Sequence, residues 1–125
     1  MNIHRVLTVL AMTAAITASG LPANTGAAWA AKDDCPDGAM CFWSRTAFRG
    51  EPVLLFEDES APDLTRSHPW LNDNVRSVWN RIDEPWCLYQ HPHYTGISKK
   101  LNWKEDVSDM NSSVLKYRSS SLRPC

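Results

Sequence analysis

The stretch CFWSRTAFRG (residues 41–50) recurs, in different letters but the same pattern, as CLYQHPHYTG (residues 87–96). At an offset of 46 residues, the two copies share a cysteine, two aromatic residues and a glycine. Such matches in scarce residue types are hard to obtain by chance, and an internal repeat indicates a fold built from two like units. Each glycine follows the second aromatic residue by two positions, where a chain folding over its own side chain needs positive φ or a close backbone approach.

Short runs of alternating apolar and polar residues predict strands after each copy. The clearest run, residues 97–103, would place Ile97, Leu101 and Trp103 on one face of a strand. Similar runs occupy residues 51–56, 75–80 and 113–118. No long helical period is present, and eight prolines interrupt the chain. We therefore expect an all-β sandwich, to which each copy supplies about four strands.

The first 30 residues have the pattern of an export signal. A basic start is followed by an apolar run from Val6 to about Ile16 and by an A-x-A cleavage site at residues 28–30. The apolar run falls far short of the ~20 residues needed to span a bilayer. We expect cleavage after Ala30, a secreted extracellular protein without a membrane anchor, and one mature domain, residues 31–125.

Four cysteines follow the expected signal, at positions 35, 41, 87 and 125. An even number in an exported chain indicates a disulfide framework. Of the three possible pairings we favour Cys35 with Cys41, since the turn between them contains Pro36 and Gly38. The other bond would then join Cys87 to Cys125. No C-x-x-C pair is present, which argues against a zinc site.

The pattern of two aromatic residues and a glycine, followed later by an Asn-Asp-x-x-Ser-Ser-like segment, resembles the Greek-key motif of the βγ-crystallin superfamily. The segment reads NDNVRS at residues 72–77 and SDMNSS at residues 108–113. Motif one would span about 39–82 and motif two about 85–120. With the Cys-Pro-x-Gly-x-x-Cys opening at residues 35–41, the chain is most similar to secreted bacterial proteins of peptidase inhibitor family 36. The resemblance implies a disulfide-stabilised βγ-crystallin-like sandwich of two Greek keys.

The resemblance also raises the question of calcium. In calcium-binding relatives, a Ser or Thr at the fifth position of the segment supplies a hydroxyl oxygen, a hard ligand that suits Ca²⁺. The first copy has Arg76 there, which places a cation where calcium would bind. The second keeps Ser112. We expect no cofactor, with weak calcium binding as the alternative. The candidate ligands, which otherwise cap turns, are Asn72, Asp73, Asp109 and Ser112.

Similarity to the inhibitor family implies a peptidase as partner, since some members inhibit metallopeptidases. From its glycine to the last serine of its segment, the first copy is longer by about ten residues, most naturally within residues 57–71. Long loops on β scaffolds often carry binding sites. Here His68, Pro69, Trp70 and Leu71 offer an apolar anchor with a charged rim. The alternative is that Trp70 folds back over the core.

Two other features give weaker signals. The short disulfide-closed loop associated with inhibition in the family has no counterpart, because Cys87 lacks a cysteine partner a few residues away. No target-facing residue can be carried over from it. His91 and His93 form an H-x-H pair, but two ligands without a third nearby are weak evidence for a metal, and exposed turn histidines are expected.

Composition narrows the function. The net charge is −1 and no basic stripe alternates with aromatic residues, so we expect no nucleic acid partner. No nucleophile elbow, paired-carboxylate context or metal-binding helix is present, so we expect no enzymatic activity. The sequence favours a monomeric secreted binding protein that inhibits a metallopeptidase. The alternative is a calcium-binding, antimicrobial or stress-related βγ-crystallin module without inhibitory activity.

Overall fold

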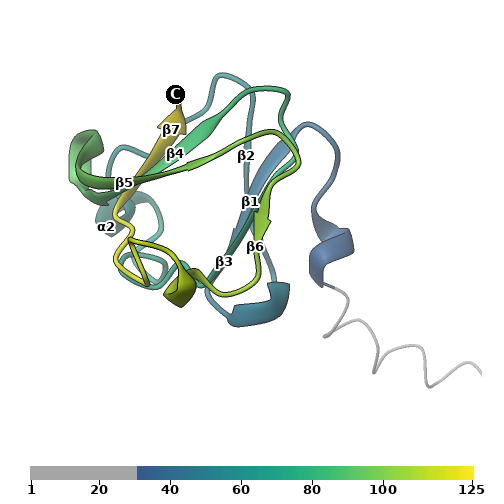
Figure 1. Ribbon diagram of the computed structural model, residues 1–125, viewed down its shortest axis with the longest axis horizontal. Coiled ribbons are helices and arrows are strands. Elements are labelled where there is room, and N and C mark those ends of the chain that lie inside the picture. The colour runs from purple at the N-terminus through teal and green to yellow at the C-terminus, as the bar shows by residue number, and fades with distance from the viewer. Residues whose placement is uncertain (1–30) are drawn as a thin grey trace, which may run out of the picture.

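The computed structural model describes residues 31–125, so the expected export signal at residues 1–30 lies outside the described residues. Two antiparallel sheets enclose the core (Figure 1), with strand orders β2-β1-β3-β6 and β5-β4-β7. The strands are β1 (Ala39–Trp43), β2 (Val53–Phe56), β3 (Ser77–Asn80), β4 (Trp86–His91), β5 (Thr95–Leu101), β6 (Asp106–Val107) and β7 (Ser121–Pro124). The predicted all-β architecture is confirmed.

The helical segments of the described residues are all short. They are α2 (Leu64–Ser67) and the 3₁₀ turns η1 (Ala31–Asp34), η2 (Thr46–Phe48), η3 (Pro92–Tyr94) and η4 (Met110–Ser112). Within residues 31–125, no helix has the length and apolar character needed to cross a membrane.

Each copy of the repeat pairs some of its backbone with the sheet of the other copy. β6 belongs to the second copy but pairs with β3 of the first. In return, Ala61 of the first copy forms an isolated bridge with Leu122 in β7. The two copies therefore interlock, a feature that the sequence analysis did not predict.

The alternation of side chains along β1 divides the interior into two clusters. Met40 and Phe42 enter the main core between the sheets, together with Trp86 of β4. Cys41 and Trp43 enter a second cluster on the outer face of β1, which the N-terminal segment covers. Because both faces are covered, every residue of β1 is buried.

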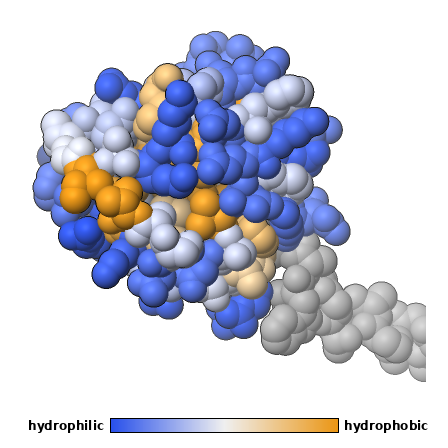
Figure 2. Space-filling view, in the orientation of Figure 1, coloured by the Kyte–Doolittle hydropathy of each residue, from blue (hydrophilic) through white to orange (hydrophobic). Residues whose placement is uncertain are grey.

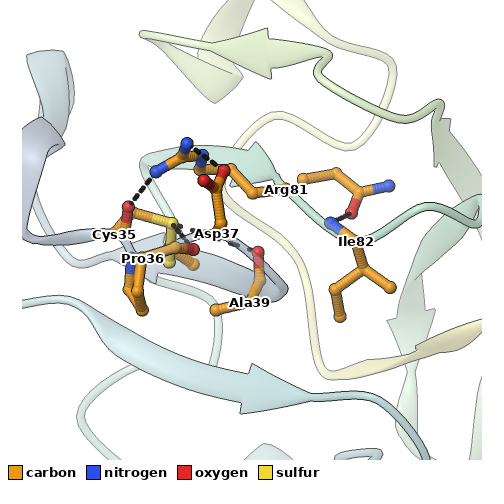
Figure 3. The surroundings of a disulfide bond; sticks show 8 residues. Cys35, Pro36, Asp37, Ala39, Arg81 and Ile82 are labelled. Carbon is orange, nitrogen blue, oxygen red and sulfur yellow. Dashed lines mark hydrogen bonds and ion pairs between the residues drawn. A yellow bond between two sulfur atoms is a disulfide. The ribbon is translucent and has the colours of Figure 1, made fainter.

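Both disulfides have the pairing favoured from the sequence. Cys35 is bonded to Cys41 and Cys87 to Cys125, with Cα atoms 5.9 and 5.8 Å apart. All four cysteines of residues 31–125 are therefore in disulfide bonds. Figure 3 shows the first bridge beside Arg81, whose Nη1 donates to the Cys35 carbonyl at 2.6 Å. The bridge and this hydrogen bond hold the N-terminal segment against the sheet.

The two repeated turns share a backbone conformation. Gly50 and Gly96 both have φ of +84°, the left-handed region in which glycine is favoured, as expected. The two aromatic rings of each copy pack edge to face, with centroids 5.2 Å apart in the first copy and 5.8 Å in the second. The repeated pattern therefore specifies a folded turn and the aromatic pair that supports it.

Ser77 and Ser121 occupy the same place in the two copies. Each hydroxyl accepts a hydrogen bond from the backbone N–H of the second aromatic residue, at 3.1 Å from Phe48 and 3.0 Å from Tyr94. Each also donates to a carbonyl of its turn at 2.6 Å. The true counterpart of Ser77 is therefore Ser121, and the alignment with Ser113 is wrong.

This register also changes the loop lengths. Leu64 and Met110 are equivalent, because each backbone N–H donates to a carbonyl of the opposite copy, at 2.9 and 2.7 Å. Ser77 follows Leu64 by 13 residues and Ser121 follows Met110 by 11. The first copy is longer by two residues rather than ten, so the expected insertion within 57–71 is wrong.

Two strand expectations need correction. Residues 113–118 form a succession of turns, and Lys116 has φ of +53°, which a regular strand cannot contain. Trp103 lies beyond the end of β5 and is 52% exposed, and Ile97 is 44% exposed, so of the three only Leu101 is buried as expected. The strands expected at 51–56 and 75–80 are confirmed as the shorter β2 and β3.

Candidate functional site

The 57–71 loop joins β2 to β3 and is fixed at several points. Ala61 exchanges two backbone hydrogen bonds with Leu122, both 2.9 Å long. The Leu64 N–H donates to the Ser120 carbonyl at 2.9 Å, and the Leu64 side chain is fully buried. The loop, which includes α2 beside β7 in Figure 1, is thus held against the second copy.

Local interactions explain why α2 begins and ends where it does. Asp63 caps its first turn, with Oδ1 accepting from the Thr65 N–H at 3.0 Å. Hydrogen bonds from Thr65, that of the hydroxyl first, lower the pKa of the Asp63 carboxyl. The helix ends at His68, since the ring of Pro69 disfavours helical backbone in the preceding residue.

The segment after α2 presents a tryptophan in a defined orientation. The His68 ring packs edge to face against Phe42 of the core, with centroids 6.1 Å apart, and against Trp70 at 5.4 Å. Asn74 Nδ2 donates to the Trp70 carbonyl at 3.1 Å. Trp70 nevertheless has 60% of its surface exposed. Its indole is therefore positioned by the fold and open to solvent.

Partial burial lowers the pKa of the His68 imidazole, because the charged form loses hydration. The ring is accordingly neutral at pH 7, which suits its packing between two aromatic rings. The Ser67 Oγ lies 3.0 Å from its Nδ1 and supplies a polar partner.

The four loop residues singled out from the sequence lie in different environments. Pro69 and Trp70 are exposed, and His68 is half-buried. Leu71 is 1% exposed and belongs to the main core, so its side chain is unavailable to a partner. The structure brings Trp70, His68 and Pro69 together at the surface, and Trp70 does not fold back over the core.

Two of the predicted calcium ligands stabilise η4 instead: Asp109 is its N-cap, and Ser112 is its last residue. Asp109 Oδ1 accepts from the Asn111 N–H at 2.9 Å, and the Ser112 hydroxyl donates to the Asp109 carbonyl at 2.8 Å. The Tyr117 hydroxyl also donates to Asp109 at 2.6 Å, which lowers the pKa of the Asp109 carboxyl and raises that of Tyr117. One oxygen of this carboxylate, Oδ1, therefore accepts two hydrogen bonds from the protein.

The fifth segment position of the second copy is Ser120 rather than Ser112. The backbone N–H groups of Arg76 and Ser120 donate to the carbonyls of Trp43 and Tyr89, the first aromatic residues of their copies, both at 2.8 Å. Ser112 makes no such contact across the repeat: its own N–H bonds to Asp109 inside η4.

The two equivalent positions have different surroundings. The Arg76 guanidinium lies 4.8 Å from the centre of the Tyr117 ring, so one site is filled by a cation of the protein. The Ser120 Oγ instead lies 3.4 Å from Oδ1 of Asp73, and the buried Asn72 Oδ1 has no hydrogen-bond partner in residues 31–125. Calcium does not fit the first site. The second offers three side-chain oxygens of the kind that calcium binds, with one negative charge.

Other metal sites find no support in the described part of the chain. No group of three or more His, Cys, Asp or Glu side chains converges within residues 31–125. His91 and His93 are both exposed, as expected for turn histidines.

Sequence reasoning missed Asp63, Ser120 and Tyr117. A signal for Asp63 was present, because it precedes Asp109 by 46 residues, the offset of the repeat, and both residues cap a helical turn. Ser120 was missed because five serines lie between positions 112 and 121, and only the position of the strand decides among the possible registers.

Comparison with known proteins adds a family and a fold. The family model of peptidase inhibitor family I36 matches residues 28–101. No curated protein matches the sequence. Among solved structures, a βγ-crystallin from Ciona intestinalis is 21% identical, with a TM-score of 0.60, covering 70% of this chain and 100% of that chain.

Two further structures extend the comparison. IPSE/alpha-1 from Schistosoma mansoni eggs is 25% identical, with a TM-score of 0.56, covering 72% of this chain and 87% of that chain. The domain of Abundant Perithecial Protein from Neurospora crassa, solved in a Ca²⁺-bound form, is 20% identical, with a TM-score of 0.57 and coverage of 71% and 90%. Together these structures show that the chain has the βγ-crystallin fold.

Proposed function

The chain belongs to peptidase inhibitor family I36, and from that premise we propose that it is a secreted binding protein that inhibits a peptidase, with metallopeptidases as the first candidates. The 57–71 loop is the proposed contact surface. Two disulfides in the described residues are consistent with an oxidising, extracellular location. The inhibitor family and the fold suggest a protein without catalytic activity.

The observation that carries this proposal is the exposed, oriented indole of Trp70. Tryptophan is enriched at interface hot spots, where a few large side chains contribute most of the binding free energy. His68 and Asn74 hold Trp70 before any partner arrives, so less conformational entropy is lost on binding. The face in Figure 2 is mainly hydrophilic with separate apolar spots.

The rim of the loop adds charge. Three acidic residues, at positions 57–59, are exposed, and Asp63 forms an ion pair with Arg66 at 3.6 Å. Charge at a rim mainly affects association rate and partner choice. We expect the target surface around the Trp70 contact to be basic or neutral.

The proposal is tested with purified protein against a panel of secreted zinc metallopeptidases and serine peptidases. We expect inhibition of at least one of them, and Trp70→Ala should raise its inhibition constant at least about tenfold. Val114→Ala removes another exposed apolar side chain and should leave inhibition unchanged. Unchanged inhibition by Trp70→Ala would show that the loop is not the contact surface, and no inhibition across the panel would contradict the proposed function.

Calcium binding is a second candidate function, favoured by the unpartnered Asn72 Oδ1 beside Asp73 and Ser120. With one carboxylate, we expect a single weak site, with a dissociation constant on the order of 1 mM. Calorimetric titration should show Ca²⁺ binding that Ser120→Ala abolishes and Ser112→Ala does not. A titration without heat, together with no thermal shift at millimolar Ca²⁺, would dispose of this candidate.

A further inference from the structure

A concave surface, called the groove below, lies between the Cys35–Cys41 turn, β3 and the turn that joins β5 to β6. Its volume is about 220 Å³, close to the size of one sugar ring. The residues that line it are Asp37, Trp79, Arg81, Trp103, Lys104 and Asp106. None of them belongs to the 57–71 loop, so this groove is separate from the proposed peptidase contact.

Trp103 is the exposed aromatic surface of the groove. Its side chain is 52% exposed and belongs to neither hydrophobic cluster of residues 31–125. The turn that carries it is nevertheless ordered: the Lys104 N–H donates to the Asn80 carbonyl at 2.7 Å, and Glu105 accepts from the Asn102 N–H at 2.8 Å. The Lys104 ammonium lies 4.5 Å from the centre of the Trp103 ring and covers part of it, so a ligand can stack on the indole surface that remains exposed.

The opposite wall is held by the N-terminal segment. The Arg81 guanidinium lies 4.6 Å from the centre of the Trp79 ring and forms an ion pair with Asp37, as Figure 3 shows for the Arg81 and Asp37 side chains. Lys32 Nζ lies 4.6 Å from the same ring and is paired with Asp106. Both carboxylates therefore have partners that hold them in place, with oxygens that can still accept further hydrogen bonds.

The charges of the groove restrict its ligand. Each charge of the groove already has a partner within the protein: Asp37 pairs with Arg81, Asp106 pairs with Lys32, and the Lys104 ammonium lies over the Trp103 ring. An anion would meet both carboxylates and a cation would meet both basic groups, so neither is favoured. A neutral ligand whose hydroxyls both donate and accept can pair with all four, and its apolar C–H face can cover Trp103.

We propose that this groove binds one neutral pyranose ring of a glycan, with Trp103 as the stacking surface. Arg81 and Lys104 donate to the sugar hydroxyl oxygens, and Asp37 and Asp106 accept from the sugar hydroxyl groups. Because the site is shallow and takes a single ring, we expect dissociation constants between about 0.1 and 10 mM. The proposal does not depend on peptidase inhibition.

Calorimetric titration of the purified protein with chitohexaose, cellohexaose and mannohexaose tests the proposal. At least one should bind in this range, and Trp103→Ala should weaken its binding about tenfold or more. Trp103→Phe, which keeps an aromatic face, should retain part of the affinity. The matched control is Phe56→Ala, which removes an exposed aromatic ring from β2 and should leave binding unchanged.

Three results would overturn the proposal. One is no binding of any of the three oligosaccharides at about 10 mM. Another is wild-type affinity in a Trp103→Ala variant with an unchanged far-ultraviolet spectrum. The third is binding of a heparin hexasaccharide or of hexalysine without binding of the neutral oligosaccharides, which would assign the groove to a charged ligand.

Discussion

Single hydroxyl groups hold the two repeated turns to their strands. Ser77 and Ser121 are fully buried, and they are the first residues of β3 and β7. Each hydroxyl accepts one hydrogen bond and donates another, so its removal leaves two backbone groups unpaired. Buried backbone groups without partners are costly, which makes these serines more important than their size suggests.

We therefore expect Ser77→Ala and Ser121→Ala each to lower the free energy of unfolding by about 1–3 kcal/mol. Ser113→Ala removes a single hydrogen bond, from the Ser113 hydroxyl to the Met110 carbonyl, and should cost less, about 0.5–1 kcal/mol. Urea unfolding of the three variants measures the difference. A Ser113 variant as unstable as the other two would contradict the register in which Ser121 matches Ser77.

The Arg76 guanidinium fills the candidate calcium site of the first copy and contacts Tyr117 of the second copy. Its guanidinium packs on Tyr117 and its Nε donates to Asn74 Oδ1 at 2.9 Å, which ties the two segments together. We expect Arg76→Ala to lower the melting temperature by about 2–5 °C. Arg66→Ala, whose side chain is 89% exposed, should change it by less. Equal shifts in the two thermal melts would show that the Tyr117 contact contributes nothing.

At the scale of elements, α2 and the histidine after it connect the surface to the core. α2 is only four residues long, so its own hydrogen bonds cannot stabilise it. It forms because Leu64 is buried, Asp63 caps its start and the Ser120 carbonyl accepts from its first N–H. The His68 ring contacts both the core Phe42 ring and Trp70, so the orientation of Trp70 depends on the packing of the core.

This connection should depend on pH. The pKa of His68 is lower in the folded state than the usual 6.5, so the unfolded chain takes up the proton first. The contribution of His68 is fully present above the unfolded value and is lost as pH falls below about 6.5. We expect stability to fall slightly between about pH 7 and 5, with a simultaneous change in Trp70 fluorescence.

His68→Gln keeps a polar side chain without this titration and serves as the comparison. Its unfolding free energy should fall less over the same pH range than that of the wild-type protein. Parallel pH profiles for the two proteins would exclude His68 as the titrating group. Trp70→Ala identifies the fluorescence of the loop among the six tryptophans.

At the scale of the whole molecule, the repeat was enough to predict the fold but not its exchange of strands. Cysteine, aromatic and glycine positions specify the two turns, and the strands expected at 51–56 and 75–80 form as β2 and β3. The exchanged parts, β6 and the Ala61 bridge, comprise two residues and one, too short for any periodicity. They form because of contacts between the copies, which local sequence does not contain.

The candidate site was predictable to a similar degree. Trp70 could be selected as a large apolar residue in a polar loop, but the burial of Leu71 depends on the path of the chain around it. The groove around Trp103 could not be foreseen, because the alternation of residues 97–103 placed this tryptophan on the inner face of a strand. Its residues come from three separate segments that only the folded chain brings together.

Interlocked sheets should unfold as one unit, and the disulfides test this expectation. Each sheet contains a piece of the other copy, so loss of either sheet exposes the shared core, and we expect a single cooperative transition.

Cys87–Cys125 closes a separation of 38 residues and Cys35–Cys41 one of 6. From loop entropy, replacing Cys87 and Cys125 by serine should lower the free energy of unfolding by roughly 4 kcal/mol. Replacing Cys35 and Cys41 should lower it by roughly 2.5 kcal/mol. Both variants should keep one transition in calorimetry, since each bond lies within one copy and the pairing between the copies remains. Two separate transitions in the Cys87→Ser/Cys125→Ser variant would mean that the copies fold independently and that the exchanged strands add little to the stability of the domain.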